Sequence, residues 1–252
     1  MILSLWRALH AEQLKLKGTL ALAMCLIAPA TVIVLNTLMA LVRTPAGNAV
    51  HEMPYMMWAM INYSLWAILM LPLFITLQSA LLAGLEHGNH QWKHLLALPL
   101  PKSVHFTVKW LVLWLMNAVA SLILMLLIPA SGWMLDLMSS NVQMTGPVPW
   151  QKLLLLSLQI GIASSLMVGI HTAIALRWQS FTVASASGMV ATVAGFLIAQ
   201  SSRYGHYYPW ALQVQMFTNP PKHLELALWY GGLGGIATLL IGAWYFNRRE
   251  MS

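Results

Sequence analysis

Six long apolar segments, nearly free of charged residues, constrain the fold of this chain more than any other feature. They lie at about residues 20–42, 60–83, 110–133, 153–176, 181–200 and 226–246. About 20 helical residues cross a bilayer core roughly 30 Å thick, so each segment is long enough to span it. The chain has 252 residues and is only 8% charged, whereas about a quarter of a soluble domain is charged. We therefore predict an all-α integral membrane protein, with six transmembrane helices in a single domain over residues 1–252.

The positions of lysine and arginine predict how these helices are oriented. Cytoplasmic loops of membrane proteins carry an excess of both residues. With the N-terminus inside, nine basic residues fall on the cytoplasmic side and four on the outer side. Both termini and the connector between spans two and three are therefore predicted to be cytoplasmic. The inner group is Arg7, Lys15, Lys17, Lys93, Lys102, Lys109, Arg177, Arg248 and Arg249, and the outer group is Arg43, Lys152, Arg203 and Lys222. The formal charge of +7 does not indicate nucleic-acid binding, because the basic residues sit at the ends of apolar segments.

Residues 2–17 have the pattern of an amphipathic helix that precedes the first span. Such a helix is expected to lie in the cytoplasmic membrane interface. A generic basic anchor explains the same residues equally well. On a helix, Ile2, Leu5, Trp6, Leu9 and Leu16 share one face, and Ser4, Arg7, Ala11 and Lys15 share the other.

Prolines and small residues predict where the spans bend and where they pack closely. Pro29, Pro72 and Pro129 fall within the first three spans, and each removes a backbone hydrogen bond and can kink its helix. In the fifth span, serines and threonines accompany Gly188 and Gly195. Small residues of this kind let two helices approach closely. We therefore expect one face of the fifth span to pack tightly against another helix.

The loops on the predicted outer side differ in composition. Residues 43–59 and 134–152 contain several proline and glycine breakers and are predicted to be irregular. Residues 201–225 are rich in aromatic side chains and contain Pro209 and the pair Pro220-Pro221. We expect this last loop to pack against the bilayer edge or to re-enter it shallowly.

The predicted spans contain no aspartate or glutamate. Ion-coupled transporters need ionisable or cation-coordinating groups within the membrane, so the chain lacks an evident driving-ion site. His171 is the one strongly titratable side chain well inside a span. It, Asn62 and Gln78 either face a translocation path or, more commonly, form hydrogen bonds with a neighbouring helix.

The sequence also lacks a phosphate-binding loop. The pattern G-x-x-x-x-G-K-[ST] does not occur, and neither does the H-E-x-x-H zinc motif. Any ATP chemistry therefore has to come from another chain.

The polar connector at residues 84–108 contains His87, His90 and His94 at helical spacing, with Glu86 before them. Three imidazoles and a carboxylate are a possible zinc or nickel ligand set. A solvated or protein-contacting helix face is the simpler interpretation, because a glycine and an asparagine between the histidines weaken the helix. We therefore predict no metal in this chain.

Three stretches carry a resemblance to a known family. The first runs through the connector as Glu86, Gly88, Trp92-Lys93-His94-Leu95-Leu96-Ala97-Leu98-Pro99, Lys102 and Lys109. The second is Glu12-Gln-Leu-Lys15-Leu-Lys17-Gly-Thr19, and the third is Tyr208-Pro209-Trp210. In these residues the chain resembles type-2 ABC transporter permeases, most closely those of lantibiotic-immunity and related small bacterial exporters. The histidines at 87, 90 and 94 are not part of that pattern.

The resemblance implies a division of labour between chains. Two cytoplasmic ATPase subunits would bind ATP and Mg. This chain would form the path together with a second permease, either identical or a paralogue. It would then be no enzyme and would bind no cofactor. The location would be the bacterial cytoplasmic membrane, and the exported substrate would be hydrophobic or amphipathic, such as an antimicrobial peptide or a lipid-like molecule. The connector would form a coupling helix on the ATPase through Glu86, Gly88, Trp92, Lys93, Leu96, Leu98 and Pro99, and Trp6, Arg7, Glu12, Lys15 and Lys17 would belong to the interfacial helix.

One alternative comes from a different class of protein. The histidines at 87, 90, 94, 105 and 171 would also suit an integral membrane enzyme or a metal-dependent membrane protein. An ATPase that co-purifies with the chain would distinguish the permease from this alternative.

Overall fold

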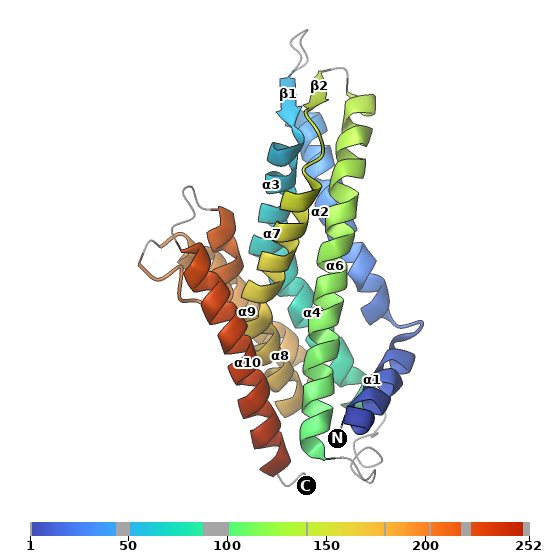
Figure 1. Ribbon diagram of the computed structural model, residues 1–252, viewed down its shortest axis with the longest axis vertical. Coiled ribbons are helices and arrows are strands. Elements are labelled where there is room, and N and C mark those ends of the chain that lie inside the picture. The colour runs from blue at the N-terminus through green and yellow to red at the C-terminus, as the bar shows by residue number, and fades with distance from the viewer. Residues whose placement is uncertain are drawn as a thin grey trace.

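Helices that run roughly along one long axis make up nearly all of the computed structural model (Figure 1). It describes residues 2–43, 51–87, 101–139, 141–178, 180–201, 203–217 and 223–248. The helices are α1 (Ile2–Leu16), α2 (Leu20–Arg43), α3 (Tyr55–Leu65), α4 (Leu71–His87), α6 (Lys102–Met138), α7 (Trp150–Ala163), α8 (Ser165–Arg177), α9 (Phe181–Ala199) and α10 (Leu224–Arg248). A π-helical turn, η1 (Trp66–Met70), joins α3 to α4, and a 3-10 helix, η2 (Leu212–Phe217), precedes α10.

The six predicted spans correspond to helices of suitable length and composition. Within the described residues, five continuous stretches qualify, namely Leu20–Val42, Tyr55–Leu85, Ser103–Met138, Phe181–Ala199 and Leu224–Arg248. The remaining predicted span, 153–176, is a pair of helices, α7 and α8, bent by 43° at a short break. The all-α membrane class is therefore confirmed, and the fourth span is broken instead of continuous.

The break between α7 and α8 is explained by two serines that bond back to the preceding turn. The hydroxyl groups of Ser164 and Ser165 each donate to the carbonyl oxygen of Gly161 at 3.0 Å. Back-bonding of this kind bends helices. Helix α6 braces the bend, because Asn117 Nδ2 donates to Ser164 Oγ at 2.8 Å and Trp114 Nε1 donates to Ser165 Oγ at 3.0 Å.

The second span contains the π-helical turn directly before Pro72. The N–H group of Leu71 bonds to the carbonyl oxygen of Trp66, which is the wide turn of a π-helix. Pro72 is the second residue of α4, and because the helix continues from η1 into α4, its missing N–H group leaves a gap in the hydrogen-bond ladder at this turn. The Trp66 ring is fully buried and its Nε1 donates to Ser121 Oγ of α6 at 3.3 Å. The irregular turn is therefore held firmly inside the bundle.

Two of the loops that the sequence predicts to be irregular contain short strands. Strands β1 (His51–Pro54) and β2 (Val142–Thr145) pair in parallel, with His51 opposite Val142 and Pro54 opposite Thr145. They lie at the end of the bundle opposite to α1 (Figure 1). The prediction of irregular structure is wrong here because four residues are too few for an alternating pattern to be recognised.

The fifth span, α9, packs closely on α4 through its small residues, as predicted. A Cβ atom on Gly188 would lie 2.2 Å from Thr76 Cγ2 of α4, and one on Gly195 would lie 2.8 Å from Trp210 Cβ. Trp210 begins a buried stretch that leads into η2, where Leu212 and Gln213 are fully buried. This part of the last loop packs against α7 and α10, so it enters the bundle and does not lie along its edge.

Candidate functional site

The predicted coupling residues belong to the connector between α4 and α6. Helix α4 ends at His87 and α6 begins at Lys102, and both ends lie at the same end of the bundle as α1 (Figure 1). The side chains of Glu86 and His87 lie outside the described part of the chain. The same is true of the whole of residues Gly88, His90, Trp92, Lys93, His94, Leu96, Leu98 and Pro99. Their predicted roles therefore stay predictions, and the described site is the part of the bundle from which the connector starts.

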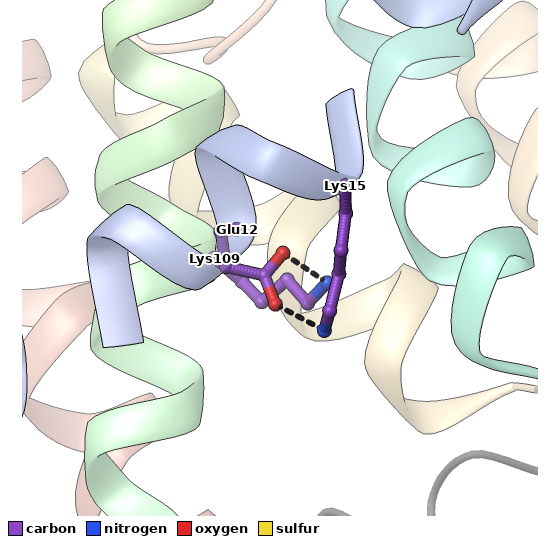
Figure 2. A network of polar contacts seen from close by, with 3 residues as sticks. All are labelled: Glu12, Lys15 and Lys109. Carbon is purple, nitrogen blue, oxygen red and sulfur yellow. Dashed lines mark hydrogen bonds and ion pairs between the residues drawn. The ribbon is translucent and has the colours of Figure 1, made fainter. Parts of the chain in front are cut away.

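A buried ion network lies at this base of the bundle (Figure 2). The carboxylate of Glu12, on α1, accepts a bond from Lys109 Nζ of α6 at 2.7 Å. Its other oxygen accepts a bond from Lys15 Nζ, one turn along α1, also at 2.7 Å. Glu12 is 7% exposed and Lys109 is 5% exposed. The network therefore fastens α1 to α6 in a place that water scarcely reaches.

The charge state of Glu12 follows from its surroundings. Burial by itself would raise the pKa of this carboxyl group, but the positive charges of Lys109 and Lys15 and their hydrogen bonds outweigh that effect and hold the pKa below its usual value. Glu12 is therefore ionised at neutral pH. A buried charge is strongly destabilised when its partner is removed, so the network resists separation of α1 from α6.

Helix α1 forms over Ile2–Leu16, which confirms the helix predicted for residues 2–17. Leu5 and Leu9 pack against the bundle, whereas Trp6 is 70% exposed. The position of this helix in the membrane interface stays a prediction. Arg7 and Lys17 are also exposed. The helix ends before Gly18, whose φ of +73° lets the chain turn sharply into α2.

The three residues named as a possible pathway all lie inside the bundle and bond to other helices. Asn62 Oδ1 accepts from Asn36 Nδ2 of α2 at 3.0 Å. Gln78 Nε2 donates to the carbonyl oxygen of Ala21 of α2 at 2.7 Å. The hydrogen bond of His171 Nε2 is to Thr76 Oγ1 of α4, at 3.3 Å. All three side chains are fully buried, so interhelical bonding accounts for each, and a pathway role stays a prediction.

The pairing of Glu12 with Lys109 was not predicted from the sequence. A sequence signal for it does exist, because Lys109 lies seven residues inside α6 and a lysine within an apolar helix needs a partner. The sequence predicts that the third span begins near residue 110, so Lys109 falls outside the predicted helix. For this reason its need for a partner was not recognised. The serines that bend α7 and α8 were missed as well.

The histidine-based alternative has little support in the described residues. Among them, no group of three or more His, Cys, Asp or Glu side chains lies close enough together to hold a metal ion. His171 instead makes an edge contact with the ring of Trp210, with ring centroids 5.5 Å apart. His105 lies on α6 and His171 on α8. The connector histidines lie outside this comparison.

Apolar helices with a charged network at one end define a multi-pass membrane protein. Comparison with protein families adds the identity of its class: residues 8–195, from α1 to α9, match the family described as ABC-2 family transporter protein. The chain belongs to this family, which makes it a permease subunit of an ABC transporter, and the family implies that it works with ABC ATPase subunits. The resemblance to type-2 ABC permeases is thereby confirmed. No curated protein and no solved structure matched the chain.

Proposed function

We propose that this permease exports a hydrophobic or amphipathic molecule, such as an antimicrobial peptide or a lipid-like compound, from a bacterial cytoplasmic membrane. Two copies of a separate ATPase would bind ATP and Mg, and this chain would bind no cofactor. The path would lie between this single-domain chain and a second permease, either identical or a paralogue. Its resemblance to lantibiotic-immunity permeases supports a peptide substrate, and the positive-inside distribution of basic residues supports cytoplasmic termini.

The observation that carries this proposal is the buried pair of Glu12 and Lys109. Lys109 lies two turns beyond the first residue of α6, and α6 directly follows the connector. A movement of the connector on the ATPase would shift the start of α6 and, through the 2.7 Å ion pair, carry α1 with it. Helix α1 would lie in the cytoplasmic interface, with the exposed Trp6 toward lipid. The ATPase would thus move two membrane elements together.

A coupling assay tests the proposal. The permease is produced with its ATPase, and complex assembly and substrate-stimulated ATP hydrolysis are measured for Trp92→Ala and Glu86→Ala. We expect both variants to weaken assembly or stimulation, because tryptophan is a typical anchor in a protein groove and the family resemblance places Glu86 in the same coupling segment. Trp244→Ala is the matched control, since Trp244 is an exposed tryptophan near the end of α10. Wild-type assembly and stimulation in both connector variants would overturn the coupling role.

Affinity purification in mild detergent tests the proposed partners. We expect the tagged permease to retain an ATPase chain and a second permease. A tagged and an untagged copy of this chain, produced together, distinguish an identical partner from a paralogue. An isolated monomer that transports without an ATPase would contradict the proposed assembly.

A further inference from the structure

A groove of about 470 Å³ opens on the surface of the bundle between α8 and α10. Its walls are mostly apolar and include Gly169, Ala173 and Ile174 of α8 and Thr238 and Ile241 of α10. Ala173 and Ile241 are exposed side chains, so the groove is open to whatever surrounds the bundle. Its volume falls in the range of roughly 300–1,000 Å³ that is typical of small-molecule pockets.

Helices α8 and α10 touch at one point, and the groove opens between them beyond that contact. A Cβ atom on Gly169 would collide with the side chain of Thr238, so α8 and α10 touch there. One turn further along α8 the residue is Ala173, whose side chain is too small to fill the space. Gly242 of α10 also lines the groove, although a Cβ atom there would meet the ring of Phe106 of α6. From Gly169 to Arg177 the groove extends along about 12 Å of α8. Such a narrow apolar channel suits a hydrocarbon chain.

A cation and two aromatic rings lie at one end of the groove. Arg177 is the last residue of α8, and its Cζ atom is 5.9 Å from the ring centroid of Trp178. Trp178 is 48% exposed, and Tyr245 of α10 is 50% exposed. Tryptophan and tyrosine are enriched at membrane interfaces, and an arginine at a helix end extends its head group toward the same layer. This end of the groove is therefore suited to the head-group region of the bilayer.

The charges of the described residues favour an anionic lipid over a second copy of the chain. In the part of the chain that the structure describes, Arg177 forms no ion pair with a carboxylate. Glu12 is already bound to two lysines. The other described carboxylates, Glu52, Asp136 and Glu225, lie in β1, near the end of α6 and at the start of α10. All three lie away from the end of the groove that Arg177 occupies. A lipid phosphate is therefore the better partner for Arg177.

We propose that this groove binds one anionic phospholipid, with an acyl chain along Gly169, Ala173 and Ile241 and the phosphate on the guanidinium group of Arg177. Arginine binds phosphate through two parallel hydrogen bonds. Both kinds of head group contain the phosphate, but only in the anionic one is its negative charge not offset by a choline cation, so the charge of Arg177 favours the anionic lipid. This lipid site goes beyond the proposed export function and does not depend on which substrate is moved. It requires that α8 and α10 span the membrane, with Arg177 at the interface.

Native mass spectrometry of the full chain tests the site. The protein is exchanged into nanodiscs that contain equal amounts of phosphatidylglycerol and phosphatidylcholine, and the lipids that stay bound after release are counted. We expect one phosphatidylglycerol per chain in preference to phosphatidylcholine. Arg177→Gln should lower the retained phosphatidylglycerol about fivefold, because it removes one cation near the membrane surface. Ala173→Phe, at an exposed position, should block the groove while Arg177 is kept.

Two matched variants control for charge and size. Lys152→Gln removes an exposed cation at the start of α7, and Val190→Phe enlarges a 71% exposed side chain on α9. Neither should change the retained lipid, and thermal unfolding checks that every variant folds. Equal retention of the two lipids by the wild type would overturn the proposal. So would a response to Arg177→Gln without a response to Ala173→Phe, since that result would assign the lipid to surface charge and not to the groove.

Discussion

At the scale of single residues, the charge of Glu12 strengthens the bonds that its carboxylate accepts from Lys109 and Lys15. Glu12→Gln takes away the carboxylate that accepts a 2.7 Å bond from Lys109. Removing one partner from a buried ion pair costs roughly 3–5 kcal/mol, so we expect α1 to come loose from α6. Hydrogen exchange of residues 2–16 measures this release. Lys15→Gln is the control, because the Lys15 side chain is 28% exposed and exposed pairs contribute about 0–1 kcal/mol.

A double replacement distinguishes charge pairing from simple packing. In Glu12→Leu with Lys109→Leu, both buried charges are gone, and apolar replacements of a buried ion pair are often neutral or stabilising. We therefore expect α1 to regain most of the protection that Glu12→Gln loses. If the double variant is as poorly protected as the single one, charge does not hold α1 in place.

The pH dependence of the α1 contact follows from the lowered pKa of Glu12. A carboxyl group whose pKa is lower in the folded state stabilises that state fully above its unfolded pKa, about 4.3 for glutamate. The stabilisation is lost only as the pH falls through the lowered value. A fluorophore on Trp6→Cys should therefore report an unchanged α1 between pH 8 and 5 and its release in stronger acid. Cys25 is buried and does not compete for the label. A release near pH 6 would contradict this assignment.

At the scale of elements, the contact between α9 and α4 depends on Gly188. Its missing Cβ would lie 2.2 Å from Thr76 and 2.6 Å from His171. We expect Gly188→Leu to destabilise the fold by at least about 1–3 kcal/mol, the usual cost of overpacking a core. Thermal unfolding in detergent measures the change. Gly84→Ala on α4 is the control, since a Cβ there meets nothing within 4 Å, and a similar loss in both variants would refute the packing argument.

How much of the fold could be predicted from the sequence also differs between elements. Apolar length alone located the spans, because the bilayer sets the length of every helix that crosses it. It did not locate the bend at Ser164, since a serine hydroxyl that bonds back to Gly161 leaves composition unchanged. The ends of α6 were also missed, because its polar ends extend past the apolar run that was used to find it. The strands were too short to leave an alternating pattern.

The candidate site was less accessible to prediction than the spans. Glu12 and Lys109 are 97 residues apart in the sequence, and no periodicity links positions that far apart. The connector residues were recognised only by their resemblance to a family. The family that this resemblance predicts is confirmed, whereas the contacts of the connector residues with an ATPase stay a prediction.

At the scale of the whole molecule, the pair of β1 and β2 joins the start of α3 to the end of α6. Met53 and Met144 are opposite each other in this sheet, at a separation that suits a disulfide between paired strands. We expect a disulfide formed by Met53→Cys with Met144→Cys to leave transport and ATP hydrolysis intact, because the sheet already holds the two ends together. Transport that stops on oxidation and returns on reduction would show that these ends have to separate.

Helix α6 reaches from the connector to this sheet without interruption. Its 37 residues correspond to about 55 Å of α-helix, and such a helix transmits displacement by tilting more readily than by compressing. It is fastened to α1 at one end through Glu12 and leads into β2 at the other. Nucleotide binding or hydrolysis at the ATPase subunits would therefore displace the end of α6 on the opposite side of the membrane. A fluorophore beside β2 would report the nucleotide state of the ATPase subunits without contacting them.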